Sequence, residues 1–517
     1  MKKKCIKILL LSLLFSSLPI INAYAANVEY VAGKNRYETA AMISDKLNYN
    51  SAILVNGYSL VDGLSASGLS GATNSPILLT ETNNIPSSTL SKLSKANKVY
   101  LVGGDGVISK NIENKLKQSG KTVVRLGGKD RFITSHLVAN EINNIKGISE
   151  LYYVNGLIGE ADAMSIAPVA ARSGNPVILT NGRDTTYKKQ VKAYSIGGTG
   201  VINTSFDSFS ERISGINRFE TNKKVISKFF PSKNNVNLSK SLELIDALTV
   251  SALKEPVVLV DNNSDKSSIA GANSLTVYGD ISQDAVNSAK SYTYGDAVVF
   301  YSQHQDDETI FAGSTVVDAI KSVGAENVYI VLITDGDESG VFTAERYRHL
   351  TTLEKSTLRN NEFKAATSQL GVLEKNLIFL NQPEKTVDLK MLENTILDFE
   401  NKYSTVTHIT HSYKYDSHSQ HLKTGKKMLE LYKKGLIEDC RFFGRKELIP
   451  NTNKKLLINS VADTEDERSK VLMACYEYKV DNKDMVREGI GYKSVASLFD
   501  PLTANPLTPS YLHEPGL

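Results

Sequence analysis

The sequence AGKNRYET at residues 32–39 recurs twice further along the chain, as GGKDRFIT at 127–134 and as SGINRFET at 214–221. The copies lie about ninety residues apart, which leaves room for one small folded unit per copy. We therefore expect three similar units in a row, and not one long domain.

Other segments recur in the same order within each copy. A helical apolar pattern opens at Asp62, Asp162 and Asp246. A short apolar strand follows at 76–79, 176–179 and 256–259, and another closes each copy at 99–104, 193–198 and 275–280. Strands that are apolar on both faces are typical of parallel sheets covered by helices, so each copy predicts a small α/β unit.

Residues 27–288 resemble the type 2 clostridial cell wall binding repeat, which occurs in threes. The resemblance implies Rossmann-like repeats packed as a pseudo-threefold trimer that binds an anionic wall polysaccharide non-covalently. We expect repeats at 26–121, 122–209 and 210–291. The recurring Arg36, Arg131 and Arg218 are candidate polymer ligands, and the alternative is an ion pair or hydrogen bond within each repeat, because arginine serves both purposes.

The chain begins with a predicted signal peptide at residues 1–25. Four lysines precede an apolar run at 8–15, and Ala23-Tyr24-Ala25 supplies small residues for cleavage. The run is shorter than the ~20 residues of a membrane-spanning helix, and no later segment is a better candidate. We expect a secreted protein with no transmembrane segment in its mature chain. The resemblance to the wall-binding repeat implies a location at the cell wall or surface of a Gram-positive bacterium.

Charge and histidine divide the mature chain into two parts. Residues 26–291 carry 29 basic and 23 acidic side chains, whereas residues 292–517 carry 27 and 33. A basic anchor on an acidic polymer is one interpretation, and an accidental difference in surface charge is the other. Seven of the eight histidines lie beyond residue 303. Cys440 and Cys475 remain after signal cleavage and form one disulfide or none.

Beyond residue 291 the pattern predicts a separate α/β domain at 292–517. A strand at 297–301 leads into HQDDE at 304–308, and further strands also end in polar residues. The last of these, at 406–410, leads to His418 and His421. Ligands in open α/β sheets lie beyond the carboxyl ends of the strands, so these side chains indicate a site there.

A catalytic zinc needs three protein ligands and one open position. We select His304, Asp307 and His421 as ligands, with Asp306 as the general base and His418 near the oxyanion or the leaving amine. The alternatives are a solvated run of acids and histidines with structural partners. Iron, cobalt or manganese suits the same ligands.

The same residues resemble the PIG-L or LmbE family of zinc-dependent sugar N-deacetylases, over residues 296–432. The resemblance implies a Rossmann-like fold and the same five roles, and it places Arg359 near the substrate. Gln305 stands where the family has proline, and Gln420 where it has an acid or asparagine. Neither is a ligand, but the first change relaxes the turn that presents the ligands.

We therefore predict hydrolysis of the acetamido group of an N-acetylated sugar of N-acetylglucosamine type. One rival is a structural or adhesive protein, associated with the surface layer, whose second domain is inactive. Another keeps the metal but hydrolyses a phosphoester or a different amide. Expected partners are an anionic wall polysaccharide, the N-acetylated sugar and surface-layer proteins, and no nucleic acid.

Overall fold

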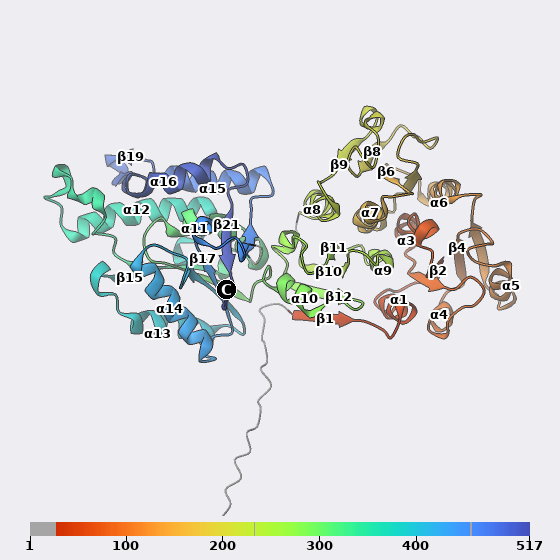
Figure 1. Ribbon diagram of the computed structural model, residues 1–517, viewed down its shortest axis with the longest axis horizontal. Helices are drawn as coiled ribbons and strands as arrows, with labels where there is room; N and C mark the ends of the chain where they lie inside the picture. Colours follow the sequence, from red (N-terminus) through yellow and green to blue (C-terminus); the bar gives the residue numbers. More distant parts are fainter. Residues whose placement is uncertain (1–26, 232, 455–456) are drawn as a thin grey trace, which may run out of the picture.

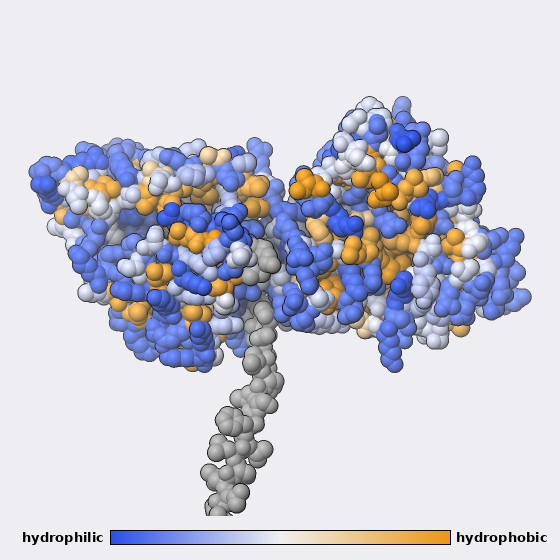
Figure 2. Space-filling model, in the orientation of Figure 1, coloured by the Kyte–Doolittle hydropathy of each residue, from blue (hydrophilic) through white to orange (hydrophobic). Residues whose placement is uncertain are grey.

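The computed structural model describes residues 27–231, 233–454 and 457–517, so the predicted signal peptide lies outside the described residues. Figure 1 shows two parts side by side, one containing the elements from β1 (Asn27–Val31) to α10 (Gln283–Lys290) and the other those from β13 (Ala297–Ser302) to β21 (Ser510–His513). A notch separates them on the face drawn in Figure 2. Within the described ranges, no helix is both long and apolar enough to cross a membrane.

The first part contains three four-stranded parallel sheets. The first sheet orders its strands as β3 (Ile77–Thr80), β2 (Ser51–Asn56), β4 (Lys98–Val102) and β5 (Thr122–Leu126). The second has β7 (Val177–Thr180), β6 (Glu150–Asn155), β8 (Lys192–Ile196) and β9 (Glu211–Ile213). The third has β11 (Val257–Val260), β10 (Asn235–Lys240), β12 (Ser274–Tyr278) and β1 (Asn27–Val31).

Each sheet takes its last strand from the segment that begins the next repeat. β5 and β9 directly precede the second and third copies of the recurring motif, yet they pair with β4 and β8 of the sheet before. β1 precedes the first copy and pairs with β12 of the third sheet, so that the three repeats form a closed ring. Neighbouring repeats therefore share strands, and the repeat boundaries drawn from the sequence stay a prediction.

Three helices lie between the sheets in Figure 1, namely α3 (Ala66–Thr73), α7 (Glu160–Ser173) and α9 (Ile245–Ser251). Gly71 lets α3 approach α7 closely, because a Cβ there would lie 1.8 Å from the Ala171 carbonyl oxygen. Ser67 of α3 and Ser251 of α9 share a hydrogen bond of 3.0 Å between their hydroxyls. The predicted pseudo-threefold arrangement of α/β repeats is confirmed.

The recurring motif begins an equivalent helix in each repeat, α1 (Arg36–Asp45), α6 (Arg131–Lys146) and α8 (Arg218–Phe229). Asn35, Asp130 and Asn217 accept backbone N–H groups as N-caps, which satisfies donors that the first helical turn leaves free. Each arginine donates to a carbonyl just beyond a strand of its own repeat, in Gly57, Gly156 and Ser241, at 2.5–2.6 Å. Each therefore joins its helix to the next strand end.

The recurring aspartates face the following repeat around the ring. Burial raises the pKa of Asp162 to about 6, against the opposing effect of Arg218 from the third repeat. Asp62 stands in the same relation to Arg131, and Asp246 to Arg36 of the first repeat. Each repeat therefore places a buried carboxylate close to its neighbour's arginine.

The second part is built on a seven-stranded sheet in the order β15, β14, β13, β16, β17, β21, β18. Its first five strands are parallel and the last two are antiparallel to their neighbours. Their bounds are β13 (Ala297–Ser302), β14 (Val328–Thr334), β15 (Leu377–Gln382), β16 (Val406–His411), β17 (Asp439–Phe443), β18 (Ile458–Ser460) and β21 (Ser510–His513). Outside this sheet, β19 (Asp481–Asn482) and β20 (Arg487–Glu488) form a short hairpin.

Helices cover both faces of this sheet. Alternate residues of β13 point to opposite faces, so that Phe300 packs with α11 (Asp307–Val323), α12 (Thr352–Leu370) and α15 (Glu465–Glu477). Val299 and Tyr301 pack with α13 (Leu389–Lys402) and α14 (Ser419–Lys433). The predicted Rossmann-like α/β fold of the second part is confirmed.

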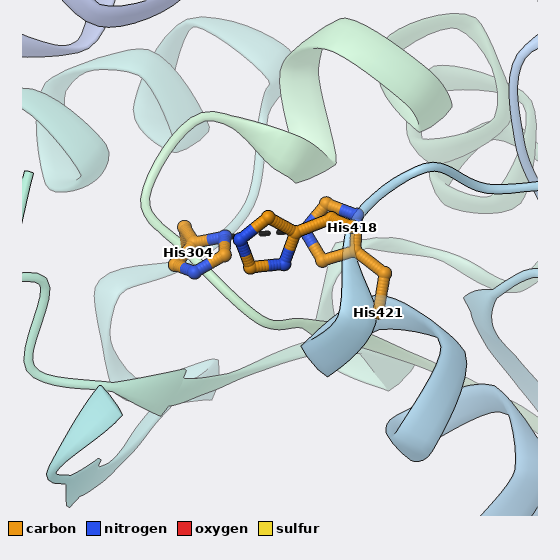
Figure 3. Close-up of side chains that lie close together, drawn as sticks. All are labelled: His304, His418 and His421. Atoms are coloured by element: carbon orange, nitrogen blue, oxygen red, sulfur yellow. Dashed lines mark hydrogen bonds between the residues drawn. The ribbon is translucent and has the colours of Figure 1, made fainter. Parts of the chain in front are cut away.

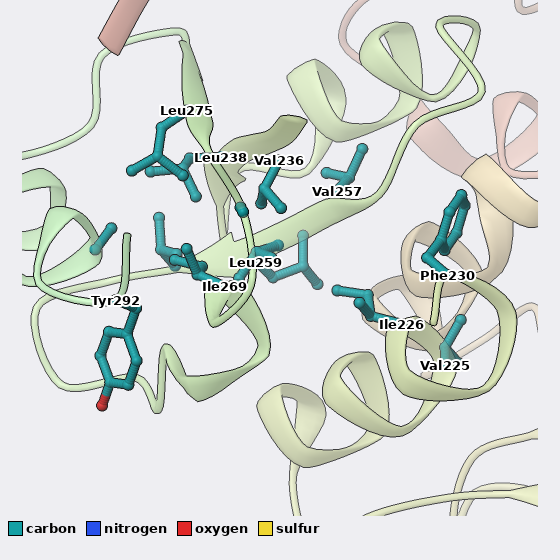
Figure 4. Close-up of a cluster of buried hydrophobic side chains, with 14 of the residues drawn as sticks. Val225, Ile226, Phe230, Val236, Leu238, Val257, Leu259, Ile269, Leu275 and Tyr292 are labelled. Carbon is teal, nitrogen blue, oxygen red and sulfur yellow. The ribbon is translucent and has the colours of Figure 1, made fainter. Parts of the chain in front are cut away.

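The third repeat also packs against the second part. Figure 4 shows the core of the third repeat, where Val236, Leu238 and Leu259 lie together and Tyr292 stands at one side. Ser322 of α11 donates to Asn273 at 2.9 Å, and Lys223 of α8 lies 3.3 Å from Asp463. Cys440 and Cys475 are buried free thiols.

Candidate metal centre and active site

The turn between β13 and α11 presents the acidic residues. Asp306 has a φ of 144°, a backbone conformation that non-glycine residues rarely adopt and that is characteristic of functional sites. Gln305 donates to the Asp335 carbonyl oxygen at 3.1 Å and to the Asn360 amide oxygen at 2.9 Å. These hydrogen bonds hold the turn at the position where the PIG-L or LmbE family has a proline.

Three predicted ligand atoms lie close together at the end of this turn. His304 Nδ1 is 3.1 Å from His421 Nε2 and 3.4 Å from Asp307 Oδ2, and His421 Nε2 is 3.5 Å from Asp307 Oδ2. A dashed line in Figure 3 joins His304, which lies on the turn, to His421, which lies on α14. Donors about 2.1 Å from a tetrahedral zinc are roughly 3.4 Å apart, so the donor set fits such an ion.

In each of these two histidines, the ring nitrogen that does not face the predicted ligand cluster contacts a carboxylate. We call it the outer nitrogen. His304 Nε2 lies 2.9 Å from Glu384, and His421 Nδ1 lies 3.0 Å from Asp416. A carboxylate on the outer nitrogen draws the ring proton there and leaves the inner lone pair free for a metal. The sequence analysis missed both acids, although each follows a strand of the sheet within a few residues.

Gln420 supports the same arrangement from α14. Its amide donates to the backbone carbonyl oxygen of Glu384 at 2.7 Å. The residue that departs from the family pattern therefore contacts the segment that holds His304.

His411 also belongs to the site, at the end of β16. Its Nε2 lies 3.2 Å from Asp307 Oδ2 and accepts the Gln303 N–H at 3.1 Å, and its ring stacks on His421 with 3.7 Å between centroids. Burial, together with the neighbouring His421, lowers the pKa of His411 to about 4. The group Asp307, His411 and His421 is also compact enough to hold an ion, as is the group His304, His418 and His421.

The carboxylate of Asp306, the predicted general base, contacts Arg359. Arg359 Nη2 donates to the Asp306 carboxylate at 3.0 Å and to the Gln305 carbonyl oxygen at 2.6 Å, and the two side chains are almost fully buried. Burial raises the pKa of Asp306 to about 6, and Arg359 opposes this effect. Glu362 lies 3.7 Å from Arg359 and accepts two backbone N–H groups at 490–491.

A cavity of about 800 Å³ opens over the site, within the ~300–1,000 Å³ range of small-molecule pockets. The predicted residues His304, Asp306, Asp307, Arg359, His418 and His421 all contribute to its wall. His418 is exposed at the start of α14, with its ring centroid 4.6 Å from that of His421. The cavity also takes Val495 and Leu498 from α16 (Ile490–Ala504), in a region where the sequence shows no motif.

Two known families match the chain, and their matches overlap at residues 299–339. The family described as Cell wall binding domain 2 (CWB2) matches residues 31–113, 125–207 and 212–339, which is more than half of the chain. The chain therefore belongs to this family. The family described as GlcNAc-PI de-N-acetylase (PIG-L) matches residues 299–432, so the second part of the chain contains a PIG-L domain.

Several bacterial proteins are similar to the chain. N-acetylmuramoyl-L-alanine amidase LytC of Bacillus subtilis (strain 168) is 29% identical over 342 residues, which cover 60% of this chain and 68% of LytC. Cwp8 from Clostridium difficile has a TM-score of 0.48 and 29% identity, covering 50% of this chain and 51% of Cwp8. Cwp6 from the same organism has a TM-score of 0.49 and 24% identity, covering 75% of this chain and 64% of Cwp6.

Proposed function

We propose that the second domain removes the acetyl group from an N-acetylated sugar of N-acetylglucosamine type, while the repeats hold the protein on an anionic wall polysaccharide. The observation that carries the proposal is the convergence of His304, Asp307 and His421, with the Asp306 carboxylate beside them in one cavity. The match to the PIG-L family supports the same reaction class.

In this proposal His304, Asp307 and His421 hold a zinc ion, and iron, cobalt or manganese suits the same ligands. When bound, the ion supplies Lewis acidity toward the acetamido carbonyl and makes a water easier to deprotonate. Glu384 and Asp416 hold the two imidazoles through one ring nitrogen each, which would leave His304 Nδ1 and His421 Nε2 to bind the ion.

Asp306 acts as the general base that takes the proton of the attacking water. Its contact with Arg359 fixes the direction of the carboxylate, and its raised pKa suits a group that accepts and later returns a proton near neutral pH. His418, exposed on the cavity wall, is placed to stabilise the oxyanion or to protonate the leaving amine. Arg359 also contributes to the wall that would face the sugar.

The repeats supply the attachment to the wall, and we propose export to the cell surface with surface-layer proteins as neighbours. Arg36, Arg131 and Arg218 each use one guanidinium nitrogen on a backbone carbonyl of their own repeat. Five N–H groups per guanidinium leave further donors for polymer oxygens. Arg218 is the most exposed of the three and is the first candidate for such contact.

Metal content and acetate release test the enzymatic part of the proposal. The purified mature protein should contain near-stoichiometric zinc and release acetate from N-acetylglucosamine-containing substrates, and Asp306→Ala should abolish the acetate. A protein that binds no metal and releases no acetate, yet sediments with cell walls, would favour the structural or adhesive rival.

A further inference from the structure

The place where the sheet of one repeat meets the next repeat occurs three times, and we call it a seam. The residues at the three seams can therefore be compared with one another. β4, β8 and β12 pair with β2, β6 and β10 in the same register, so that Tyr100, Tyr194 and Thr276 occupy equivalent positions. Lys98, Lys192 and Ser274 are equivalent in the same way. Two seams therefore carry a Lys-x-Tyr pair, and the third carries Ser-x-Thr.

The tyrosines fill the first two seams. Tyr194 stacks on Tyr152 with ring centroids 5.9 Å apart, and Phe229 of the next repeat meets its edge at 5.2 Å. Lys192 lies over the Tyr194 ring at 5.1 Å, and Lys98 lies over the Tyr100 ring at 4.5 Å. An aromatic ring covered by an ammonium group therefore occupies each of these seams.

In the third seam a cavity of about 580 Å³ opens at the equivalent place. Thr276 replaces the tyrosine, and Asn237 stands where the second repeat has Tyr152. The wall combines polar and apolar side chains from β1, β10, β12 and the end of α1. They include Glu29, Lys46, Asn235, Glu255, Thr276 and Tyr278.

The charges in this cavity leave one carboxylate unpaired. Glu29 binds Lys46 at 2.6 Å. Glu255 accepts hydrogen bonds from the amides of Asn235 at 2.7 Å and Asn237 at 3.3 Å, and within the described part of the chain it forms no ion pair with a basic side chain. Burial and the nearby Glu29 and Glu255 raise the pKa of Tyr278, which therefore stays a neutral hydroxyl.

We propose that this cavity binds a hexosamine with a free ammonium group. The ammonium would pair with Glu255, and the sugar hydroxyls would bind the Asn235 amide, Thr276 and the Glu29 carboxylate. The side chains of Leu47 and Leu253 on the same wall suit the C–H face of a pyranose. With two carboxylates and one lysine, the cavity carries net negative charge and disfavours acidic sugars.

This site is separate from the proposed active site and lies in the wall-binding repeats. A sugar with a free amine is the product class of the proposed deacetylation, so the connection between the two sites rests on that proposed function. The binding itself does not, because a glucosamine ligand has no acetyl group to lose.

Calorimetric titration of the full mature protein tests the site, with the β-1,4-linked glucosamine disaccharide and its N,N'-diacetylated form as ligands at pH 6.5. All proteins carry Asp306→Ala, so that the acetylated disaccharide is not consumed. We expect the free disaccharide to bind at least tenfold more tightly than the acetylated form. Glu255→Gln should weaken its binding at least tenfold, and Thr276→Tyr should abolish it by restoring the ring of the other two seams.

Glu211→Gln is the matched control, because Glu211 in the second sheet is equivalent to Glu29 and lies at a filled seam. It should bind the disaccharide like the parent protein. Equal affinity for both disaccharides, no measurable binding, or binding that Glu255→Gln leaves intact would each overturn the proposal. Should Thr276→Tyr fail to fold, Glu255→Gln alone decides. In an otherwise unmutated chain, Glu255→Gln should keep normal acetate release, which separates this test from that of the deacetylase.

Discussion

Asp416 offers a sharp test of the proposed metal centre, because it contacts His421 without being a proposed ligand. Its Oδ2 lies 3.0 Å from His421 Nδ1, and its Oδ1 accepts the His418 N–H at 2.8 Å. Asp416→Asn removes the charge but keeps nearly the same shape. A charge-assisted hydrogen bond contributes about 1.5–3 kcal/mol. We therefore expect zinc affinity to fall about 10- to 100-fold, in the range of such supporting partners.

The assay is competition for zinc between the protein and a chromophoric chelator at fixed pH, with thermal unfolding of the metal-free proteins alongside. Asp481→Asn is the control, because Asp481 is an exposed acid paired with Lys493 by a single ion pair. It should bind zinc like the wild type. Zinc affinity within twofold of wild type for Asp416→Asn would refute the assignment of His421 as a ligand oriented by this carboxylate.

Three further predictions concern the base, a buried acid and a recurring arginine. Asp306→Asn should lower the acetate-release rate about 10²- to 10⁴-fold while zinc content stays unchanged, since a general base contributes that much, and loss of zinc would contradict the assigned role. Burial raises the pKa of Asp318 to about 7, so the folded state binds its proton more tightly than the unfolded state does, and stability should fall as pH rises from about 4 to 7. Asp318→Asn should remove up to about 4 kcal/mol of that fall in urea unfolding, and an unchanged pH profile would contradict it. Arg131→Ala should cost about 1–3 kcal/mol in urea unfolding through the unpaired Gly156 carbonyl, and lost wall sedimentation at unchanged stability would instead indicate polymer contact.

The repeated motif was enough to predict the three α/β units, but not how they share strands. β1 and β12 lie at opposite ends of the repeat region, and many apolar strands in this chain could form a similar parallel pair. The choice depends on the ring as a whole, because only the third sheet lacks a following repeat to supply its last strand. A local pattern carries no such information.

The candidate site shows the same division between local and long-range information. His304 and Asp307 belong to one turn, and His421 follows a strand of the same sheet, so the sequence places all three at one edge. Glu384 and Asp416 lie in irregular segments, where no periodicity indicates the direction of a side chain. The contact between Arg359 and Asp306 depends on how α12 packs on the turn, which the sequence does not specify.

The third repeat differs from the other two in its surroundings, and this difference explains how its seam can remain open. Replacing a buried tyrosine by threonine removes ring packing worth on the order of 3–5 kcal/mol. Within the described residues, the third repeat contacts the second part through Asn273, which accepts from Ser322 of α11, and through Lys223, which lies 3.3 Å from Asp463 just before α15. We infer that these contacts offset part of the missing ring packing, so that the third seam can hold the proposed sugar in place of a tyrosine ring.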